Sequence, residues 1–185
     1  KKWFKEAKKA EPNNPNAMCL ATVNARGYPA NRMVLLKDYD EKGFVFYTNY
    51  ESSKAHDILS TGKAALCFYW KTLQKQVRVE GAVTTVSPQE ADAYFATRPR
   101  GSQIGAWASR QSQILTGGRE ELEDSIKKYE DKFKDQDNIP RPPHWSGFRV
   151  IPSSIEFWQE MPFRLHDRVV YTKSGKGWKT SRIYP

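Results

Sequence analysis

Cysteine is scarce in this sequence, which contains two, Cys19 and Cys67, in 185 residues. Both lie in apolar runs, and their separation matches none of the spacings used by zinc sites or thiol redox motifs. The three histidines, His56, His144 and His166, are equally dispersed. We therefore expect no metal site, and we interpret the cysteines as buried small hydrophobic residues of a protein in a reducing compartment.

Long apolar runs are also absent. No stretch approaches the length of a transmembrane helix and no signal-peptide pattern opens the chain, so we expect a soluble, cytoplasmic protein without a membrane partner. The sequence begins "KKWFKEAKKA", without methionine and within an expected helix. We therefore expect that residues upstream of Lys1 are missing.

Several familiar catalytic motifs are missing as well. The sequence has no Gly-x-Gly-x-x-Gly, no P-loop and no Gly-x-Ser-x-Gly, and nucleophilic catalysis has no candidate with a visible partner. What is present is 38% hydrophobic and 13% aromatic residues, which indicate a folded protein, and a net charge of +9. This charge favours an anionic partner and leaves nucleic acid, an acidic membrane surface and a phosphorylated small molecule open.

Strand-like patterns dominate the chain, as in the alternation of Gln76 and Arg78 with Val77 and Val79. We predict strands over 17–24, 31–40, 43–49, 64–70, 75–86, 147–152, 154–159, 164–172 and 177–185. The helices do not alternate regularly with these strands, which argues against a doubly wound parallel sheet. The pattern predicts one domain over residues 1–185, mainly β, built as a closed or nearly closed antiparallel barrel with flanking helices.

Helical periodicity predicts four helices, over 3–10, from 52 or 53 to about 59, over 87–99 and over 117–135. The third has the strongest boundary signals: Ser87 as N-cap, Pro88 at the first helical position, Glu90 completing a capping box and Pro99 ending the helix. We interpret the fourth as a solvated surface helix without a chemical role.

Basic residues gather in "RLHDR", residues 164–168. In an extended strand Arg164, His166 and Arg168 would share one face, while Leu165 and Asp167 took the other. This cationic face is either an ordinary solvated surface or the contact for an anionic, electron-accepting molecule.

Two further groups of residues are candidates for anion binding. Lys54 falls in the first turn of a predicted helix, where an anion is favoured, although the lysine could equally point to water. Tyr94 and Arg98 lie four residues apart with Ser102 beyond them, an arrangement that suits a phosphate monoester or a tyrosine that packs on an arginine stem. Together these groups favour a phosphorylated aromatic cofactor over covalent catalysis.

Seven runs, "RMVLLK", "FYTN", "QVRVEG", "YFATRPRGSQIGAWAS", "RQS", "IEFWQ" and "RLHDR", follow one another along the chain. In their order and approximate spacing the chain resembles the pyridoxine (pyridoxamine) 5′-phosphate oxidase family over its whole length. The resemblance implies an FMN-binding split β-barrel with antiparallel, Greek-key-like strands, and a homodimer with FMN at the subunit interface. It also implies oxidation of pyridoxine or pyridoxamine 5′-phosphate to pyridoxal 5′-phosphate, with hydride transfer from C4′ to flavin N5 and reoxidation by O2 to H2O2.

The resemblance also implies roles for individual residues. The FMN contacts would be Arg32, Met33, Val34, Leu35, Lys37, Tyr47, Thr48, Lys54, Gln76, Gln111, Ser112, Trp158 and Arg168. The substrate site would comprise Lys37, Tyr94, Arg98, Ser102, Arg164 and His166, with the last two as the catalytic residues beside the reacting carbon. Because a guanidinium stays charged at neutral pH, we expect Arg164 to orient and stabilise, while His166 could accept a proton or donate a hydrogen bond.

The residues that depart from the family pattern are Ser53, where relatives usually carry a second basic residue, and Glu160, where they usually carry glycine. We therefore expect FMN phosphate binding to depend more on Lys54. Arg32 and Lys37 have opposite parity in the run 31–40, so a shared ligand requires a bulge or a strand end at one of them.

Two alternatives remain open. A flavin-binding split barrel with another substrate would not need Tyr94, Arg98 and Ser102 together. A basic nucleic-acid-binding barrel would bind in a strongly salt-dependent way. Excess lysine lies in the first helix and the C-terminal strands rather than on one stripe, so we expect no nucleic-acid partner.

Overall fold

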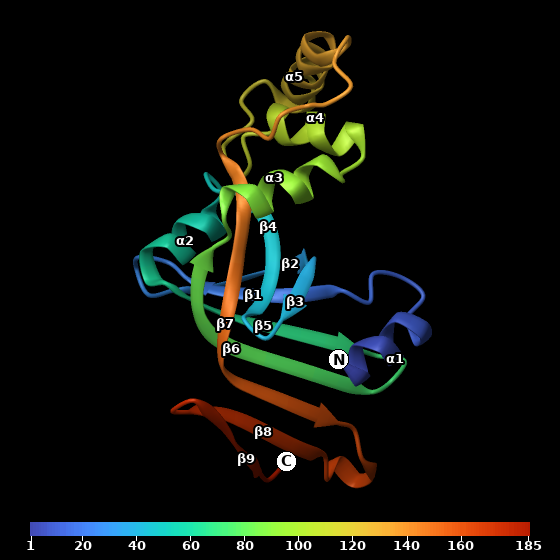
Figure 1. The fold of residues 1–185 in the computed structure, drawn as a ribbon, viewed down its shortest axis with the longest axis vertical. Helices are drawn as coiled ribbons and strands as arrows, with labels where there is room; N and C mark the ends of the chain where they lie inside the picture. Colours follow the sequence, from blue (N-terminus) through green and yellow to red (C-terminus); the bar gives the residue numbers. More distant parts are fainter. The chain divides into compact units, whose positions relative to one another are not determined.

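The computed structural model describes residues 1–185, and the chain divides into two compact units. Unit 1 comprises residues 1–46, 57–84 and 149–185, and unit 2 comprises residues 47–56 and 85–148. The helices (Figure 1) are α1 Lys2–Ala10, α2 Ser53–Thr61, α3 Pro88–Ala96, α4 Arg100–Ala108, α5 Gly118–Phe133 and the short 3-10 turn η1 Pro162–Arg164. The strands are β1 Ala17–Val23, β2 Pro29–Leu35, β3 Asp38–Asp40, β4 Gly43–Asn49, β5 Lys63–Trp70, β6 Lys75–Thr85, β7 Trp145–Gln159, β8 Asp167–Ser174 and β9 Gly177–Arg182.

The strands form one nine-stranded sheet in the order β2-β1-β5-β6-β7-β4-β3, and β8 joins β7 to β9. The pairs β1–β2, β1–β5, β3–β4, β5–β6, β7–β8 and β8–β9 are antiparallel. Strands that are distant in the sequence, such as β1 and β5, therefore lie side by side. The predicted mainly β, antiparallel architecture is confirmed, and no helix is both long and apolar enough to cross a bilayer.

The hydrophobic core of unit 1 lies on one face of the sheet. Met18 and Leu20 in β1 and Val79 in β6 are fully buried, because alternate residues of a strand point to the same side. Each such side chain contributes about 1.5–3 kcal/mol relative to exposure. The cysteines take the other parity: Cys19 lies opposite Cys67 across β1 and β5, and both are only half-buried. The prediction that they are buried is therefore wrong, since the alternation places them on the outward face.

Helix α1 packs on unit 1 through aromatic side chains. The ring of Trp3 meets Phe157 of β7 edge to face at 5.2 Å, and Phe4 meets Tyr39 in the same way at 5.3 Å. Edge-to-face pairs add about 0.5–1.5 kcal/mol beyond the area they bury. The predicted N-terminal helix is confirmed and lies beside the sheet (Figure 1).

Strand β7 is continuous over fifteen residues, where the sequence pattern predicted two strands. Pro152 does not interrupt it, because the fixed φ of proline is compatible with extended backbone. The neighbouring β6 comes very close: a Cβ on Gly81 would lie 2.0 Å from the carbonyl oxygen of Ile151. Glycine is thus required where the two backbones meet. Conversely, the predicted strand 31–40 is two strands, β2 and β3.

Helix α4 is the element that the sequence patterns missed. Helix α3 ends at Ala96 and Pro99 is the N-cap of α4, so Pro99 precedes a helix instead of ending one. Gly101 and Gly105 weaken the helical signal, because glycine is a poor helix former.

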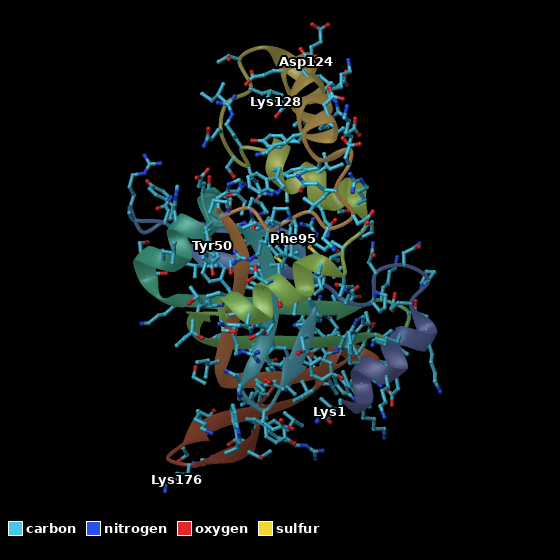
Figure 2. All side chains as sticks on the ribbon, turned by 45° about the horizontal axis from the view of Figure 1, so that its top comes forward. Lys1, Tyr50, Phe95, Asp124, Lys128 and Lys176 are labelled. Atoms are coloured by element: carbon cyan, nitrogen blue, oxygen red, sulfur yellow. The ribbon has the colours of Figure 1, made fainter.

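The core of unit 2 brings together Phe95, Ile104, Phe133, Ile139 and Trp145. Figure 2 labels Phe95, whose ring reaches this core from α3. Helix α5 closes the core through its last residue, while Asp124 and Lys128 lie on its solvated side (Figure 2). The prediction of a surface helix holds for that side only.

Candidate active site

A cluster of polar side chains surrounds Lys54 in the first turn of α2. Lys54 Nζ lies 3.2 Å from Thr48 Oγ1, 3.1 Å from Ser52 Oγ and 2.9 Å from Gln111 Oε1. Thr48 also donates to Gln111 at 3.1 Å. The Thr48 and Ser52 hydroxyls donate to Gln111 Oε1 and to the Asn49 carbonyl oxygen, so the ammonium of Lys54 and the N-terminus of α2 are the donors that suit a phosphate. The structure thus brings together three of the predicted cofactor residues, Thr48, Lys54 and Gln111, and Ser112 follows with a left-handed φ of 72°.

Three aromatic rings form a parallel stack in the same unit. The ring of Tyr47 lies 4.1 Å from that of Tyr94, at an interplanar angle of 10°, and 5.2 Å from that of Trp145, at 4°. Two residues that were predicted for different roles, Tyr47 for the cofactor and Tyr94 for the substrate, are therefore in direct contact.

Arg98 lies against the end of this stack. Its guanidinium carbon is 4.7 Å from the ring centroid of Trp145 and 5.5 Å from that of Phe95. Burial lowers the pKa of Arg98, and its Nη1 is buried without a hydrogen-bond partner. Because an unpaired buried donor costs about 1–3 kcal/mol, this nitrogen is a ready site for an anion.

The helical geometry predicted around Arg98 is wrong. Arg98 follows the C-cap Thr97, so Tyr94 and Arg98 do not lie one turn apart on a common helix. Ser102 is in the first turn of α4. The reason is that α3 ends at Ala96 and α4 begins at Arg100. Tyr94 therefore lies in α3, Arg98 in the connection and Ser102 in α4.

The predicted cofactor residues of β2 lie in unit 1. Arg32 Nη1 donates to Thr22 Oγ1 at 2.7 Å, and its Nη2 lies 3.7 Å from Asp57 Oδ2. Thr22 and Asp57 are buried, so Arg32 is anchored by two buried side chains. Met33, Val34 and Leu35 complete this strand, with Met33 65% exposed. Lys37 lies between β2 and β3, so the strand end that its parity required is present.

The segment "RLHDR" is not the extended strand that was predicted. Pro162–Arg164 form a turn in which Phe163 and Arg164 have φ of 59° and 63°, and β8 begins only at Asp167. Arg164 and His166 therefore precede the strand that contains Arg168. A left-handed non-glycine residue costs about 1–2 kcal/mol, and such strain gathers at functional sites.

His166 is held by the backbone and by an aromatic ring. The Met161 N–H donates to His166 Nδ1 at 3.2 Å, and the Trp158 ring lies 4.6 Å from the imidazole. A backbone amide can only donate, so Nδ1 accepts, and the neutral imidazole carries its proton on Nε2. Trp158 pairs with Arg168 across β7 and β8, and Gln76 lies in β6 opposite Tyr69.

Sequence reasoning missed Glu156. This carboxylate of β7 is 8% exposed and lies 2.7 Å from Arg168 Nε and 3.1 Å from Arg78 Nη1. The hydrogen bond to Glu156 raises the pKa of Arg168. The signal that was available was the single acid of "IEFWQ", set among apolar and aromatic residues.

The family model described as pyridoxamine 5′-phosphate oxidase matches residues 4–133. A second model, described as the pyridoxine 5′-phosphate oxidase C-terminal dimerisation region, matches residues 145–185 and indicates a homodimer. Together with the fold, these matches define an oxidoreductase with the FMN-binding split-barrel fold. The chain belongs to the pyridoxamine 5′-phosphate oxidase family.

Individual relatives agree with this assignment. Proteins of Brucella canis and Brucella suis, both named pyridoxine/pyridoxamine 5′-phosphate oxidase, are 60% identical over 185 residues, which cover 99% of this chain and 90% of each relative. The crystal structure of PhzG from Burkholderia lata, in complex with tetrahydrophenazine-1-carboxylic acid, is 29% identical with a TM-score of 0.92, covering 100% of this chain and 89% of that one. An FMN-binding, pyridoxamine 5′-phosphate oxidase-related protein of Nostoc punctiforme shares the fold at 17% identity, with a TM-score of 0.78 and coverage of 100% and 96%.

Proposed function

We propose that this chain oxidises pyridoxine 5′-phosphate or pyridoxamine 5′-phosphate to pyridoxal 5′-phosphate, with FMN as cofactor and O2 as electron acceptor. The observation that carries the proposal is the buried, unpartnered Nη1 of Arg98, in a chain 60% identical to relatives that bear this activity as their name. A phosphate monoester supplies the acceptor that this nitrogen needs.

The residues fit FMN as well as substrate. The ammonium of Lys54, which Thr48 and Gln111 hold at the start of α2, suits the flavin phosphate. The proposal gives the remaining flavin contacts to Arg32, Met33, Val34, Leu35, Lys37, Tyr47, Gln76, Ser112, Trp158 and Arg168. When bound, FMN would supply the hydride acceptor for C4′ of the substrate and the route for the electrons to O2, which would yield H2O2.

The chain's own residues bind and orient the substrate. Arg98, Tyr94, Ser102 and Lys37 would hold the phosphorylated end. Arg164 and His166 would lie beside the reacting carbon as the catalytic residues. Since Nδ1 of His166 accepts from Met161, the neutral ring can offer a proton at Nε2, and we assign it as a hydrogen-bond donor to the substrate rather than a base at that atom.

The proposal also covers the assembly and its setting. Residues 1–185 would act as a single FMN-binding domain, and two copies would form a homodimer with FMN at the interface, which the C-terminal dimerisation match supports. Cys19 and Cys67 are free thiols, which supports a cytoplasmic location.

The test is an anaerobic half-reaction. The protein is loaded with FMN, oxygen is removed, pyridoxine 5′-phosphate is added, and the flavin absorbance is followed. We expect bleaching that reverses when air is admitted, with release of H2O2. Unphosphorylated pyridoxine is the matched ligand control and should bleach the flavin at much higher concentration only.

Two variants separate the parts of the proposal. Lys54→Met should weaken FMN binding, while Arg98→Met should bind FMN normally and require more substrate for bleaching. A flavin that binds and stays oxidised with both phosphorylated substrates would refute the proposed reaction, whereas failure to bind FMN would refute the cofactor assignment.

A further inference from the structure

Glu156 links two arginines in the sheet of unit 1. Its Oε1 accepts from Arg168 Nε at 2.7 Å, and its Oε2 accepts from Arg78 Nη1 at 3.1 Å. The carboxylate is 8% exposed, so it is largely removed from water and held by these two partners. Burying a charge is costly unless it is paired and hydrogen-bonded, and both oxygens of Glu156 meet that requirement.

The contacts of Arg168 determine which of its donors remain available. Nε is taken by Glu156, and Nη1 donates to the carbonyl oxygen of Tyr184 at 3.2 Å. A guanidinium has five N–H groups in one plane, so contacts at two of its nitrogens fix the orientation of that plane. The N–H groups that these contacts do not use then point in a defined direction from β8.

The charges of the cluster also favour a fixed orientation of the Arg168 guanidinium. Arg78 and Arg168 lie on either side of one carboxylate, and without it two cations would face each other with no negative charge between them. Glu156 thus keeps the positive charge of Arg168 and fixes its direction at the same time. Glu80, the other partner of Arg78, is exposed and lies 3.2 Å from Arg78 Nη2.

We propose that Glu156 is a positioning residue for the flavin site, which fixes the guanidinium of Arg168 so that its remaining N–H groups are presented to FMN. This inference rests on the proposed function, which assigns Arg168 to the cofactor. Glu156 itself does not touch the flavin and acts through Arg168.

The experiment is a double-mutant cycle on FMN affinity. The dissociation constant is measured from flavin fluorescence for the wild type, Glu156→Gln, Arg168→Lys and the double variant, and the melting temperature of each FMN-free protein is recorded. Gln keeps the shape of Glu and loses its charge, while Lys cannot form the planar fork. Glu80→Gln is the matched control, because it removes the exposed carboxylate from the same Arg78.

We expect Glu156→Gln to raise the dissociation constant about tenfold, since a hydrogen bond to a charged group is lost. In the Arg168→Lys background the same substitution should change it less than about threefold. Glu80→Gln should bind FMN as the wild type does. The midpoint potential of the bound flavin should shift in Glu156→Gln and stay unchanged in Glu80→Gln.

The outcomes separate this inference from the proposed function. An equal loss of affinity in the wild-type and Arg168→Lys backgrounds would mean a merely structural role and overturn the inference. Normal binding by Glu156→Gln, with weakened binding by Arg168→Lys, would overturn the inference alone. Normal binding by Arg168→Lys would overturn the assignment of Arg168 as well. If Glu156→Gln does not fold, Glu156→Asp replaces it: an intermediate dissociation constant supports the inference, and a wild-type value overturns it.

Discussion

Replacing Arg98 with methionine distinguishes the effect of its guanidinium on stability from its effect on substrate binding. Methionine keeps an apolar stem that can pack on the rings of Trp145 and Phe95, and it removes the guanidinium with its unpartnered Nη1. If Arg98 serves the fold, its replacement should lower the free energy of unfolding. If Arg98 serves phosphate binding, its replacement should raise KM for the phosphorylated substrate.

The stabilising and destabilising contributions of Arg98 to the free energy of unfolding nearly cancel. The unpaired buried donor costs about 1–3 kcal/mol, and two cation–π contacts contribute about 0.5–1 kcal/mol each when exposed and more when desolvated. The free energy of unfolding of Arg98→Met should therefore stay within about 1 kcal/mol of the wild type. Loss of charge-assisted hydrogen bonds of about 1.5–3 kcal/mol should raise KM for the phosphorylated substrate about 10- to 100-fold.

The assays are urea unfolding of the FMN-free protein and steady-state oxidation of pyridoxine 5′-phosphate. Arg100→Met is the matched control in the same unit, because Arg100 donates to the carbonyl oxygens of Gln136 at 2.7 Å and Phe133 at 2.6 Å. It should lose about 1–3 kcal/mol of stability and keep the wild-type KM. If the free energy of unfolding of Arg98→Met is lower than that of the wild type by more than about 3 kcal/mol while KM is unchanged, the phosphate role of Arg98 is refuted.

Two further predictions concern stability. The hydrogen bond from Lys75, at 2.6 Å, holds the pKa of Glu6 below its usual 4.5. The unfolded chain therefore binds the proton first, and stability is lost as pH falls through the lowered folded pKa. The melting temperature of Glu6→Gln should decline less steeply in acid than that of the wild type, and parallel curves would contradict this. A Cβ on Gly147 would lie 2.8 Å from the ring of Tyr47, so Gly147→Ala should cost about 1–3 kcal/mol in urea unfolding, and an unchanged midpoint would contradict this close packing.

Local rules were enough for several elements. The N-terminus of α3 was predicted because Ser87 Oγ accepts from the Glu90 N–H three residues on, at 3.1 Å, and nothing outside the turn is needed. The buried parity of Val77 and Val79 followed from simple alternation. The same rules failed at Pro99, because a proline can end one helix or precede the next, and its neighbours in space decide which.

The segment before β8 shows a second kind of failure. Alternation predicted that Arg164, His166 and Arg168 share a strand face, but left-handed Phe163 and Arg164 turn the chain before the strand starts. Non-glycine residues rarely adopt this conformation, so no propensity predicts it. The pairing of β8 with β7 holds the turn in place, and that pairing is a property of the folded chain.

The sequence by itself determined the types of chemical group and most of the strands and helices, because side-chain chemistry and periodicity are local. Tertiary structure decided which groups meet. Nη1 of Arg98 lacks a hydrogen-bond partner where its guanidinium lies against Trp145 and Phe95, and Glu156 joins Arg78 to Arg168 because β6, β7 and β8 lie side by side. These contacts join residues far apart in the chain, and their energies depend on burial, which only the packed fold creates.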